Sequence, residues 1–158
     1  MKLPWYQRSR RRMLLDFHIA EWDPSFLASF DPEEMAEHVK LADATAMTVF
    51  ANTHTGLCNY PTKVGKMHEQ WVRQKRDMLG EMIQALHRRG IDAIIYYCLI
   101  YTDWYWDQHP ECRVVDGRGI SEKEYMNSWG HPHRFSLLCP NNQQYREYAL
   151  AQIREICE

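Results

Sequence analysis

Long and short connections alternate along this chain in a fixed order. Hydrophobic periodicity predicts strands at residues 13–19, 46–51 and 91–99, and helices at residues 32–43, 78–89 and 143–157. Each predicted strand is followed by a long connection, at residues 20–31, 52–77 and 100–142. The helices, in contrast, reach the next strand through Ala44-Thr45 or through Gly90 alone. Connections this long are uncommon in a compact domain unless they have a function, so this asymmetry constrains the fold strongly.

Local signals at the helix ends support this reading. Asp31 precedes Pro32, which is the arrangement preferred at a helix N-terminus. Asp77 is the corresponding N-cap of the second helix, and Gly90 follows its last turn as a stop signal. The buried face of that helix is predicted from apolar residues at helical spacing, namely Leu79, Met82, Ile83 and Leu86. The third strand is a nearly continuous apolar run, which is typical of a strand buried on both faces.

Long loops after the carboxyl ends of parallel strands are the layout of a (β/α)₈ barrel, whose active site is built from those loops. The predicted fold class is therefore α/β, as the N-terminal part (about three βα units) of a TIM barrel. We expect one partial barrel domain over residues 1–158, with residues 1–11 as a basic N-terminal extension. A doubly wound open sheet is the structural alternative. Its nucleotide-binding form is disfavoured because no glycine-rich phosphate loop follows any strand.

The length of the chain raises a difficulty for the barrel. A complete barrel takes about 250 residues, and only three of its eight strand-helix pairs can be read here. We therefore expect the chain to be a fragment of a longer protein or the product of a truncated gene. Three parallel strands alone leave two apolar edges unpaired. The sequence thus predicts self-association through open sheet edges, or pairing with a missing C-terminal half.

Composition excludes several other classes. With 19 basic and 21 acidic residues, the formal charge of −2 favours neither nucleic acid nor an anionic membrane as a partner. No apolar stretch approaches the roughly 18–20 residues that a membrane helix needs. The five cysteines are scattered without a CxxC pair, which favours a reduced, cytoplasmic setting. The arginine run at residues 8–12 is expected to be a solvated face, and no cofactor is predicted.

Aromatic content is the unusual feature of the composition, at 13% with six Trp and nine Tyr. Amide, imidazole and carboxyl groups combined with ring faces suit a sugar, because hydroxyls need donors and acceptors while the apolar sugar face stacks on aromatics. Such groups gather where each predicted strand ends. The candidate sugar-binding residues are His18, Glu21 and Trp22 after the first strand, Asn52, His54 and Tyr60 after the second, and Asp103 and Trp104 after the third.

Other roles for these residues stay open at this point. Asp16 and His18 lie two apart on the first strand, and they could close the top of the barrel through a hydrogen-bond network. His54 could be an ordinary loop histidine, and the aromatic run at residues 96–107 could be a hydrophobic lid or a subunit contact. His131 and His133 lack a spaced third ligand, so no metal site is predicted, although a metal-assisted α/β enzyme is an alternative. Cys58 and Cys98 are expected to be packed thiols.

Several of these segments resemble the α-L-fucosidases. Residues 76–82, followed by 89–91 and 96–98, are similar to the stretch in which a helix leads through an Arg-Gly turn into a strand ending Tyr-Tyr-Ser. Residues 54–60 resemble the family's His-His-Asp-Gly-Phe-Cys-Leu-Trp segment, with Thr53 and Thr55 at the positions of its first His and its Asp. Phe17-His18 resembles the family's strand-one histidine. The wider pattern, including residues 60–63 and 109–111, is similar to bacterial "hypothetical glycosyl hydrolase" barrels.

The resemblance implies a retaining glycoside hydrolase that uses two carboxyl groups, which stand about 5–5.5 Å apart in such enzymes. Its nucleophile follows the fourth strand in fucosidases and would lie beyond Glu158, so the chain would supply the wall of the −1 sugar subsite and be inactive alone. His18, His54 and Tyr60 match the family's sugar-binding positions, whereas the other five candidates rest on the residues themselves. Thr53 and Thr55 leave other deoxy- or galacto-configured sugars open. The alternative function is a non-catalytic carbohydrate-binding or scaffolding half-barrel.

Overall fold

The computed structural model describes residues 4–121 and 136–158, and the chain divides into two compact units. The first, which we call the sheet unit, comprises Met1–Ala51, Asn59–Pro61 and His68–Tyr96. The second, the aromatic unit, comprises Asn52–Cys58, Thr62–Met67 and Tyr97–Glu158. His131 and His133 lie outside the described residues.

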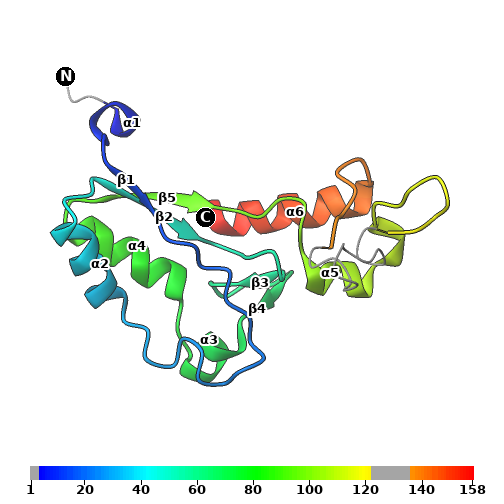
Figure 1. Cartoon of the computed structure of the whole chain (residues 1–158), viewed down its shortest axis with the longest axis horizontal. Helices are drawn as coiled ribbons and strands as arrows, with labels where there is room; N and C mark the ends of the chain where they lie inside the picture. Colours follow the sequence, from blue (N-terminus) through cyan, green and yellow to red (C-terminus); the bar gives the residue numbers. More distant parts are fainter. Residues whose placement is uncertain (1–3, 122–135) are drawn as a thin grey trace, which may run out of the picture. The chain divides into compact units, whose positions relative to one another are not determined.

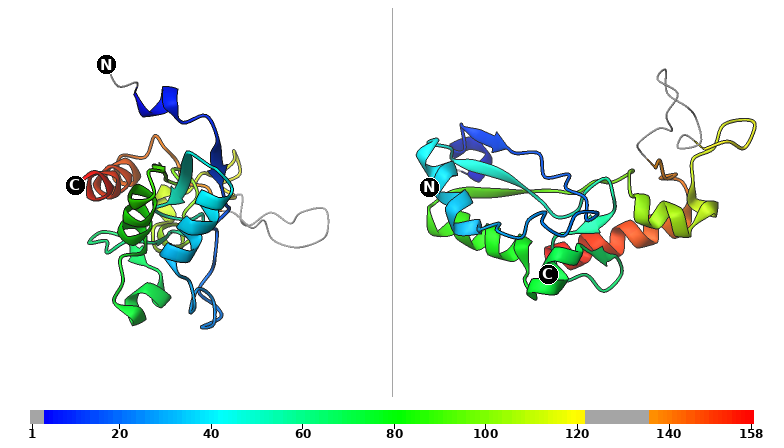
Figure 2. Two further views of the ribbon diagram at one scale, coloured as in Figure 1. Left: turned by 90° about the vertical axis from the view of Figure 1, so that its left-hand side faces the viewer. Right: turned by 60° about the horizontal axis from the view of Figure 1, so that its bottom comes forward.

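The sheet unit is built on three parallel strands in the order β1-β2-β5, with bounds Arg12–Leu14, Ala46–Phe50 and Asp92–Tyr96. Met13 pairs with Met47, which pairs in turn with Ala93. Helices α2 (Pro32–Leu41) and α4 (Met78–Arg88) lie side by side next to this sheet (Figures 1 and 2). The predicted α/β class with parallel strands is confirmed, while closure into a barrel stays a prediction.

The predicted helix caps are present. Asp31 Oδ1 accepts the backbone N–H of Glu33 at 2.8 Å at the start of α2, and Asp77 Oδ1 accepts the N–H of Gly80 at 3.0 Å at the start of α4. Gly90 ends α4 with a φ of +71°, a conformation that glycine adopts without steric cost. The apolar face of α4 is buried in the core of the unit through Met78, Leu79, Met82 and Leu86.

Two strands end well before their predicted last residues, and a side chain accounts for the first of these ends. The first strand was expected to reach Ile19, but β1 ends at Leu14. Asp16 Oδ1 accepts the N–H of His18 at 3.0 Å, a local turn that competes with strand pairing. The third strand was expected to reach residue 99, but β5 ends at Tyr96.

The long connections contain short elements that the sequence pattern did not predict. The N-terminal extension holds α1 (Trp5–Arg8), and the connection after β2 holds β3 (Leu57–Cys58), β4 (Lys66–Met67) and α3 (Glu69–Gln74). The connection after β5 holds α5 (Asp103–Gln108) and the 3₁₀ turn η1 (Pro110–Cys112). The last helix, α6 (Gln143–Cys157), has the predicted bounds, and Asn142 caps it by accepting the N–H of Tyr145 at 3.0 Å.

The basic N-terminal run is paired within the sheet unit. Arg8 forms an ion pair with Asp92 at 2.6 Å, and Arg11 pairs with Asp43. The guanidinium of Arg12 lies over the indole of a neighbouring tryptophan, 5.7 Å from the ring centroid. Exposed pairs of this kind contribute little to stability, but they occupy charges that would otherwise be offered to a polyanion.

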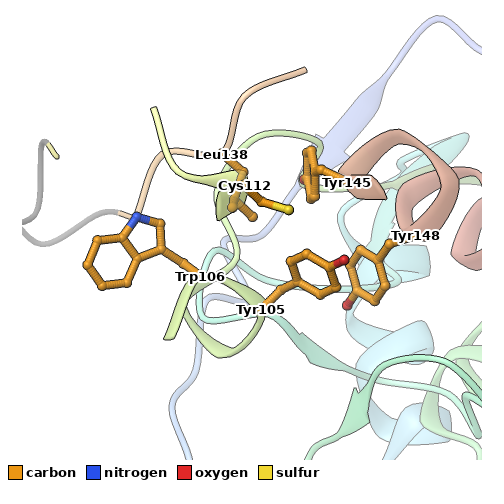
Figure 3. Packing of buried hydrophobic residues seen from close by; sticks show 6 residues of the cluster. All are labelled: Tyr105, Trp106, Cys112, Leu138, Tyr145 and Tyr148. Atoms are coloured by element: carbon orange, nitrogen blue, oxygen red, sulfur yellow. The ribbon is translucent and has the colours of Figure 1, made fainter. Parts of the chain in front are cut away.

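The aromatic unit has its own core, shown as sticks in Figure 3. The members of this cluster are Tyr105, Trp106, Cys112, Leu138, Tyr145 and Tyr148. Tyr105 and Tyr148 stack with their ring centroids 4.0 Å apart, and the guanidinium of Arg113 lies 3.5 Å from the centroid of Trp106. Some of the aromatic side chains at residues 96–107 therefore pack inside the unit.

Burial within the aromatic unit predicts an alkaline instability. Desolvation raises the pKa of Tyr97 and of Tyr145 well above the ordinary value. Because the raised pKa belongs to the folded state, stability is complete below the unfolded tyrosine pKa of about 10 and falls as the pH rises above it. We expect part of the tyrosinate absorbance to appear only on alkaline unfolding. Titration of all nine tyrosines in a single step with the fold intact would contradict this.

Candidate functional site

The eight predicted sugar-binding residues divide between the two units. The sheet unit contains His18, Glu21, Trp22 and Tyr60, and the aromatic unit contains Asn52, His54, Asp103 and Trp104. Each group is described below within its own unit.

His18 was predicted at the end of the first strand, but it follows β1 by four residues and lies at the carboxyl ends of β2 and β5. Its half-buried ring meets Phe50 and Tyr96, the last residues of these strands, at centroid distances of 5.0 and 5.7 Å. The Nδ1 of His18 is hydrogen-bonded to Oδ1 of Asp16. A carboxylate on one ring nitrogen fixes the orientation of an imidazole and makes that nitrogen the donor. The sequence placed both residues at a strand end, but the contact arises from a turn after the strand.

Glu21 and Trp22 follow in a connection that α3 holds in place. Oε2 of Glu21 accepts the backbone N–H of Glu69, the first residue of α3, at 3.1 Å. The indole of Trp22 is 77% exposed, with an edge-on contact to Phe26 at 4.6 Å. The hydroxyl of Ser25 donates to the carboxylate of Asp23 and lowers the pKa of that carboxyl below its ordinary value. Sequence periodicity gave no sign of α3, because the helix is only six residues long.

Tyr60 is buried, and its neighbour Asn59 organises this part of the sheet unit. Nδ2 of Asn59 donates to the carbonyl of Phe50 at 2.9 Å, and its Oδ1 accepts the indole N–H of Trp71 at 2.9 Å. The backbone carbonyl of Asn59 also accepts the N–H of Leu79 at 2.8 Å. Asn59 thus joins the end of β2 to α3 through its buried side-chain amide, and to α4 through its backbone carbonyl. Sequence reasoning missed this role, since an asparagine within a loop is usually exposed.

In the aromatic unit, the loop that carries His54 is bonded to the first turn of α5. The N–H of Asp103 donates to the carbonyl of His54 at 3.1 Å, and the N–H of Trp104 donates to the carbonyl of Thr55 at 3.0 Å. Gly56 continues the loop with a φ of +83°. Two amides that would be unsatisfied at a helix start are thereby paired. The structure thus brings together three of the predicted residues, His54, Asp103 and Trp104.

The side chains around this loop differ in what they contact. The carboxylate of Asp103 accepts a hydrogen bond from the hydroxyl of Ser136, and half-buried Trp104 packs against the aromatic cluster. Asn52 is buried, and its Oδ1 accepts the N–H of Cys98 at 2.6 Å, beyond the end of β5. The hydroxyl of Thr102 is buried without a hydrogen-bond partner among the described residues, which sequence reasoning did not anticipate.

Helix α6 anchors the other end of the same loop. Gln152 accepts a hydrogen bond from the hydroxyl of Tyr97 at 2.8 Å and donates to Sγ of Cys58 at 3.0 Å. Glu155 accepts a hydrogen bond from the hydroxyl of Thr62 at 2.7 Å. The sequence located α6 but not these contacts, because the partners lie between 55 and 94 residues apart.

Within residues 4–121 and 136–158, no three His, Cys, Asp or Glu side chains gather as a metal ion would require. In the same part of the chain, no helix combines the length and the apolar character needed to cross a membrane. All five cysteines lie in the described ranges as free thiols.

Comparison with known proteins connects this architecture to one group of enzymes. The fold is similar to that of α-L-fucosidase isoenzyme 2 from Paenibacillus thiaminolyticus, with a TM-score of 0.80 and 24% identity over 94% of this chain and 21% of that chain. An α-fucosidase from Thermotoga maritima, solved in complex with fucose, aligns with a TM-score of 0.51 and 21% identity over 82% of this chain and 26% of that chain.

The sequence comparisons agree. Human tissue α-L-fucosidase is 28% identical over 138 residues, which are 85% of this chain and 28% of the human protein. The chain thus spans less than a third of the length of this curated relative. The model of the family described as "Hypothetical glycosyl hydrolase 6" matches residues 31–158. The chain is therefore a member of the hypothetical glycosyl hydrolase 6 family and is related to the α-L-fucosidases.

Proposed function

We propose that this chain is the sugar-binding, N-terminal part of a (β/α)₈ glycoside hydrolase that acts on α-L-fucosides or closely related deoxy- or galacto-configured sugars. The observation that carries the proposal is the joining of the His54 loop to the start of α5 by two backbone hydrogen bonds. This holds an imidazole, a carboxylate and an indole on one short stretch of structure, in a chain that belongs to a glycosyl hydrolase family. Such a set can donate to hydroxyls, accept from them and stack on the apolar face of a sugar.

In this proposal, His54, Asp103 and Trp104 contact carbohydrate in the aromatic unit, and His18, Glu21 and Trp22 do so in the sheet unit. Asn52 supports the His54 loop, since its Oδ1 is taken by the N–H of Cys98, and Tyr60 supports the sheet unit from a buried position. His54 is itself 7% exposed, so it meets the sugar at the edge of its ring. Bond cleavage follows the retaining route, in which one carboxylate attacks the anomeric carbon and a carboxylic acid protonates the leaving oxygen. Both catalytic groups come from outside residues 1–158. The chain alone therefore binds sugar without hydrolysing a glycoside.

The test is sugar binding and turnover by the 158-residue chain. We expect L-fucose to bind with a dissociation constant on the order of 1 mM, as befits a single small ligand. His54→Ala is expected to weaken binding about tenfold, which corresponds to one lost hydrogen bond to a polar group. Calorimetry or ligand-observed NMR measures both values. His87→Ala, at an exposed histidine on α4, is the matched control and should bind as the unsubstituted chain does.

Circular dichroism of each variant separates lost binding from lost folding, and Asp103→Asn is a second variant should His54→Ala unfold. Two results would contradict the proposal: no fucose binding by the unsubstituted chain, or equal affinity in the His54 and His87 variants. Hydrolysis of 4-nitrophenyl α-L-fucoside by the chain, above the rate of His54→Ala, would show that the catalytic carboxyl groups lie within these residues.

A further inference from the structure

His68 occupies a buried position between α3 and the connection that carries Glu21. Its side chain is 2% exposed and lies at the N-cap of α3. Nδ1 of His68 accepts the N–H of Gln70 at 3.1 Å, and Nε2 lies 3.3 Å from the carbonyl of Ala20. Since a carbonyl can only accept, Nε2 carries the proton and Nδ1 does not. Both ring nitrogens are thus committed, one to the helix and the other to the residue before Glu21.

Two consecutive residues at the start of α3, His68 and Glu69, hold Ala20 and Glu21. His68 binds the backbone carbonyl of Ala20, while the N–H of Glu69 donates to the carboxylate of Glu21 at 3.1 Å. The N-cap bond fixes the direction in which the Glu69 N–H points, because it sets the geometry of the first helical turn. The position of the Glu21 carboxylate therefore depends on His68 in two ways. His68 holds the carbonyl of Ala20, the residue before Glu21, and it caps the helix whose first N–H binds the carboxylate.

We propose that His68 is a positioning residue for Glu21, which it holds ready for a sugar hydroxyl. The role of Glu21 as a sugar contact rests on the proposed function, whereas its positioning by His68 does not. His68 acts through Glu21 and the peptide before it, and touches no substrate itself. Other hydrogen bonds hold the remainder of this connection. Gln74 Nε2 donates to the carbonyl of Ala28, and the guanidinium of Arg76 donates to the carbonyl of Phe30, both at 3.0 Å. Loss of the His68 contact should therefore leave the fold in place.

The chain offers a variant that removes one hydrogen bond from this arrangement. Glu69 is the first helical residue, where proline is well tolerated, and His68 has a ψ of 130°, which suits the residue before a proline. Glu69→Pro thus deletes the N–H that binds Glu21 while retaining α3. Glu69→Ala is the matched control, because it removes the same side chain and keeps that N–H. We expect Glu69→Pro to bind L-fucose about tenfold more weakly than Glu69→Ala.

His68→Asn tests the histidine itself. Asparagine is as good an N-cap as any residue, but its side chain is too short to reach the carbonyl of Ala20. If His68 only caps α3, this variant behaves as the unsubstituted chain does; if it positions Glu21, stability is retained while fucose affinity falls about tenfold. Glu21→Ala then weakens binding in the parent but adds little in His68→Asn, because the two changes remove the same contact. Additive effects, or equal affinity of His68→Asn and parent, would overturn the proposal.

A measurement without sugar separates this inference from the proposed function. Hydrogen exchange of the Glu69 amide, followed by NMR, should accelerate about tenfold in both Glu21→Ala and His68→Asn. Should the unsubstituted chain bind no fucose, the sugar-binding proposal fails while the exchange result still decides whether His68 positions Glu21. An unchanged exchange rate in His68→Asn would show that the histidine does not control this contact.

Discussion

Gly56→Ala is expected to lower the free energy of unfolding by about 3 kcal/mol and to abolish measurable fucose binding. Two costs combine at this position. The backbone has a φ of +83°, which a residue with a Cβ adopts at a cost of about 1–2 kcal/mol. A Cβ would also collide with the hydroxyl of Thr102, which is buried beside it. Relief of the collision must displace either the loop of His54 or the first turn of α5.

Urea unfolding of three further variants divides this effect into its parts. Gly119 has nearly the same φ, +80°, but open space around it, so Gly119→Ala measures the backbone cost of about 1–2 kcal/mol. Thr102→Ala removes a hydroxyl that has no hydrogen-bond partner among the described residues, and is expected to be close to neutral alone. In the double variant with Gly56→Ala, Thr102→Ala should recover the part of the lost stability that the collision causes. Equal stability of Gly56→Ala and Gly119→Ala would contradict the proposed close packing.

Asn59→Asp is expected to destabilise the protein by about 3 kcal/mol or more, although it changes a single side-chain group. The buried amide donates to the carbonyl of Phe50, and a carboxylate there would place two oxygens against each other. Keeping the new carboxyl ionised would cost still more, because its charge would be buried without a cation beside it. The folded protein would hold the new carboxyl protonated, so the deficit relative to the parent should shrink as the pH falls. Thermal unfolding at about pH 4 and pH 7 measures this difference.

Trp71→Phe provides the comparison for Asn59. It removes the indole N–H that Oδ1 of Asn59 accepts, and leaves that oxygen unpaired at a cost of about 1–3 kcal/mol. The two changes act on different hydrogen bonds of one side chain, since Asn59→Asp removes the donor to Phe50 and Trp71→Phe removes the donor to Oδ1. The double variant should be destabilised by at least the sum of the two single changes, because the new carboxyl then loses the indole N–H that it could still accept. If Asn59→Asp is as stable as the parent at neutral pH, Asn59 does not join β2 to the helices in the manner described.

The sequence predicted those parts of the fold that depend on neighbouring residues. Helix caps at Asp31 and Asp77 and the stop at Gly90 are decided within a few residues, and all three are confirmed. The order of parallel strands also follows from local patterns, because short helix-to-strand joins leave few topologies. Strand ends were predicted less well. A side-chain oxygen of Asp16 takes the N–H of His18, and hydrophobicity does not report such a bond.

The candidate residues likewise divide into those that local chemistry singles out and those that act through distant partners. Residue chemistry singled out His54, Asp103 and Trp104 as candidates, because polar and aromatic groups after a strand are conspicuous, and their role in sugar binding stays a prediction. His68 and Gln152 were missed, since each acts through a partner that lies 48 or more residues away in the chain. A single sequence gives the periodicity of an element but not the register in which two distant elements meet. Buried polar contacts depend on that register, and only the three-dimensional structure supplies it.

The pairing of α5 with the His54 loop makes two main-chain groups natural reporters. The amides of Asp103 and Trp104 are bonded to carbonyls of a segment more than forty residues earlier, so neither is satisfied by its own helix. Their resonance positions in a nitrogen–proton correlation spectrum therefore follow the state of the loop instead of the helicity of α5. Any motion of the His54 segment, on ligand addition or on heating, can be watched at these two sites without attaching a label.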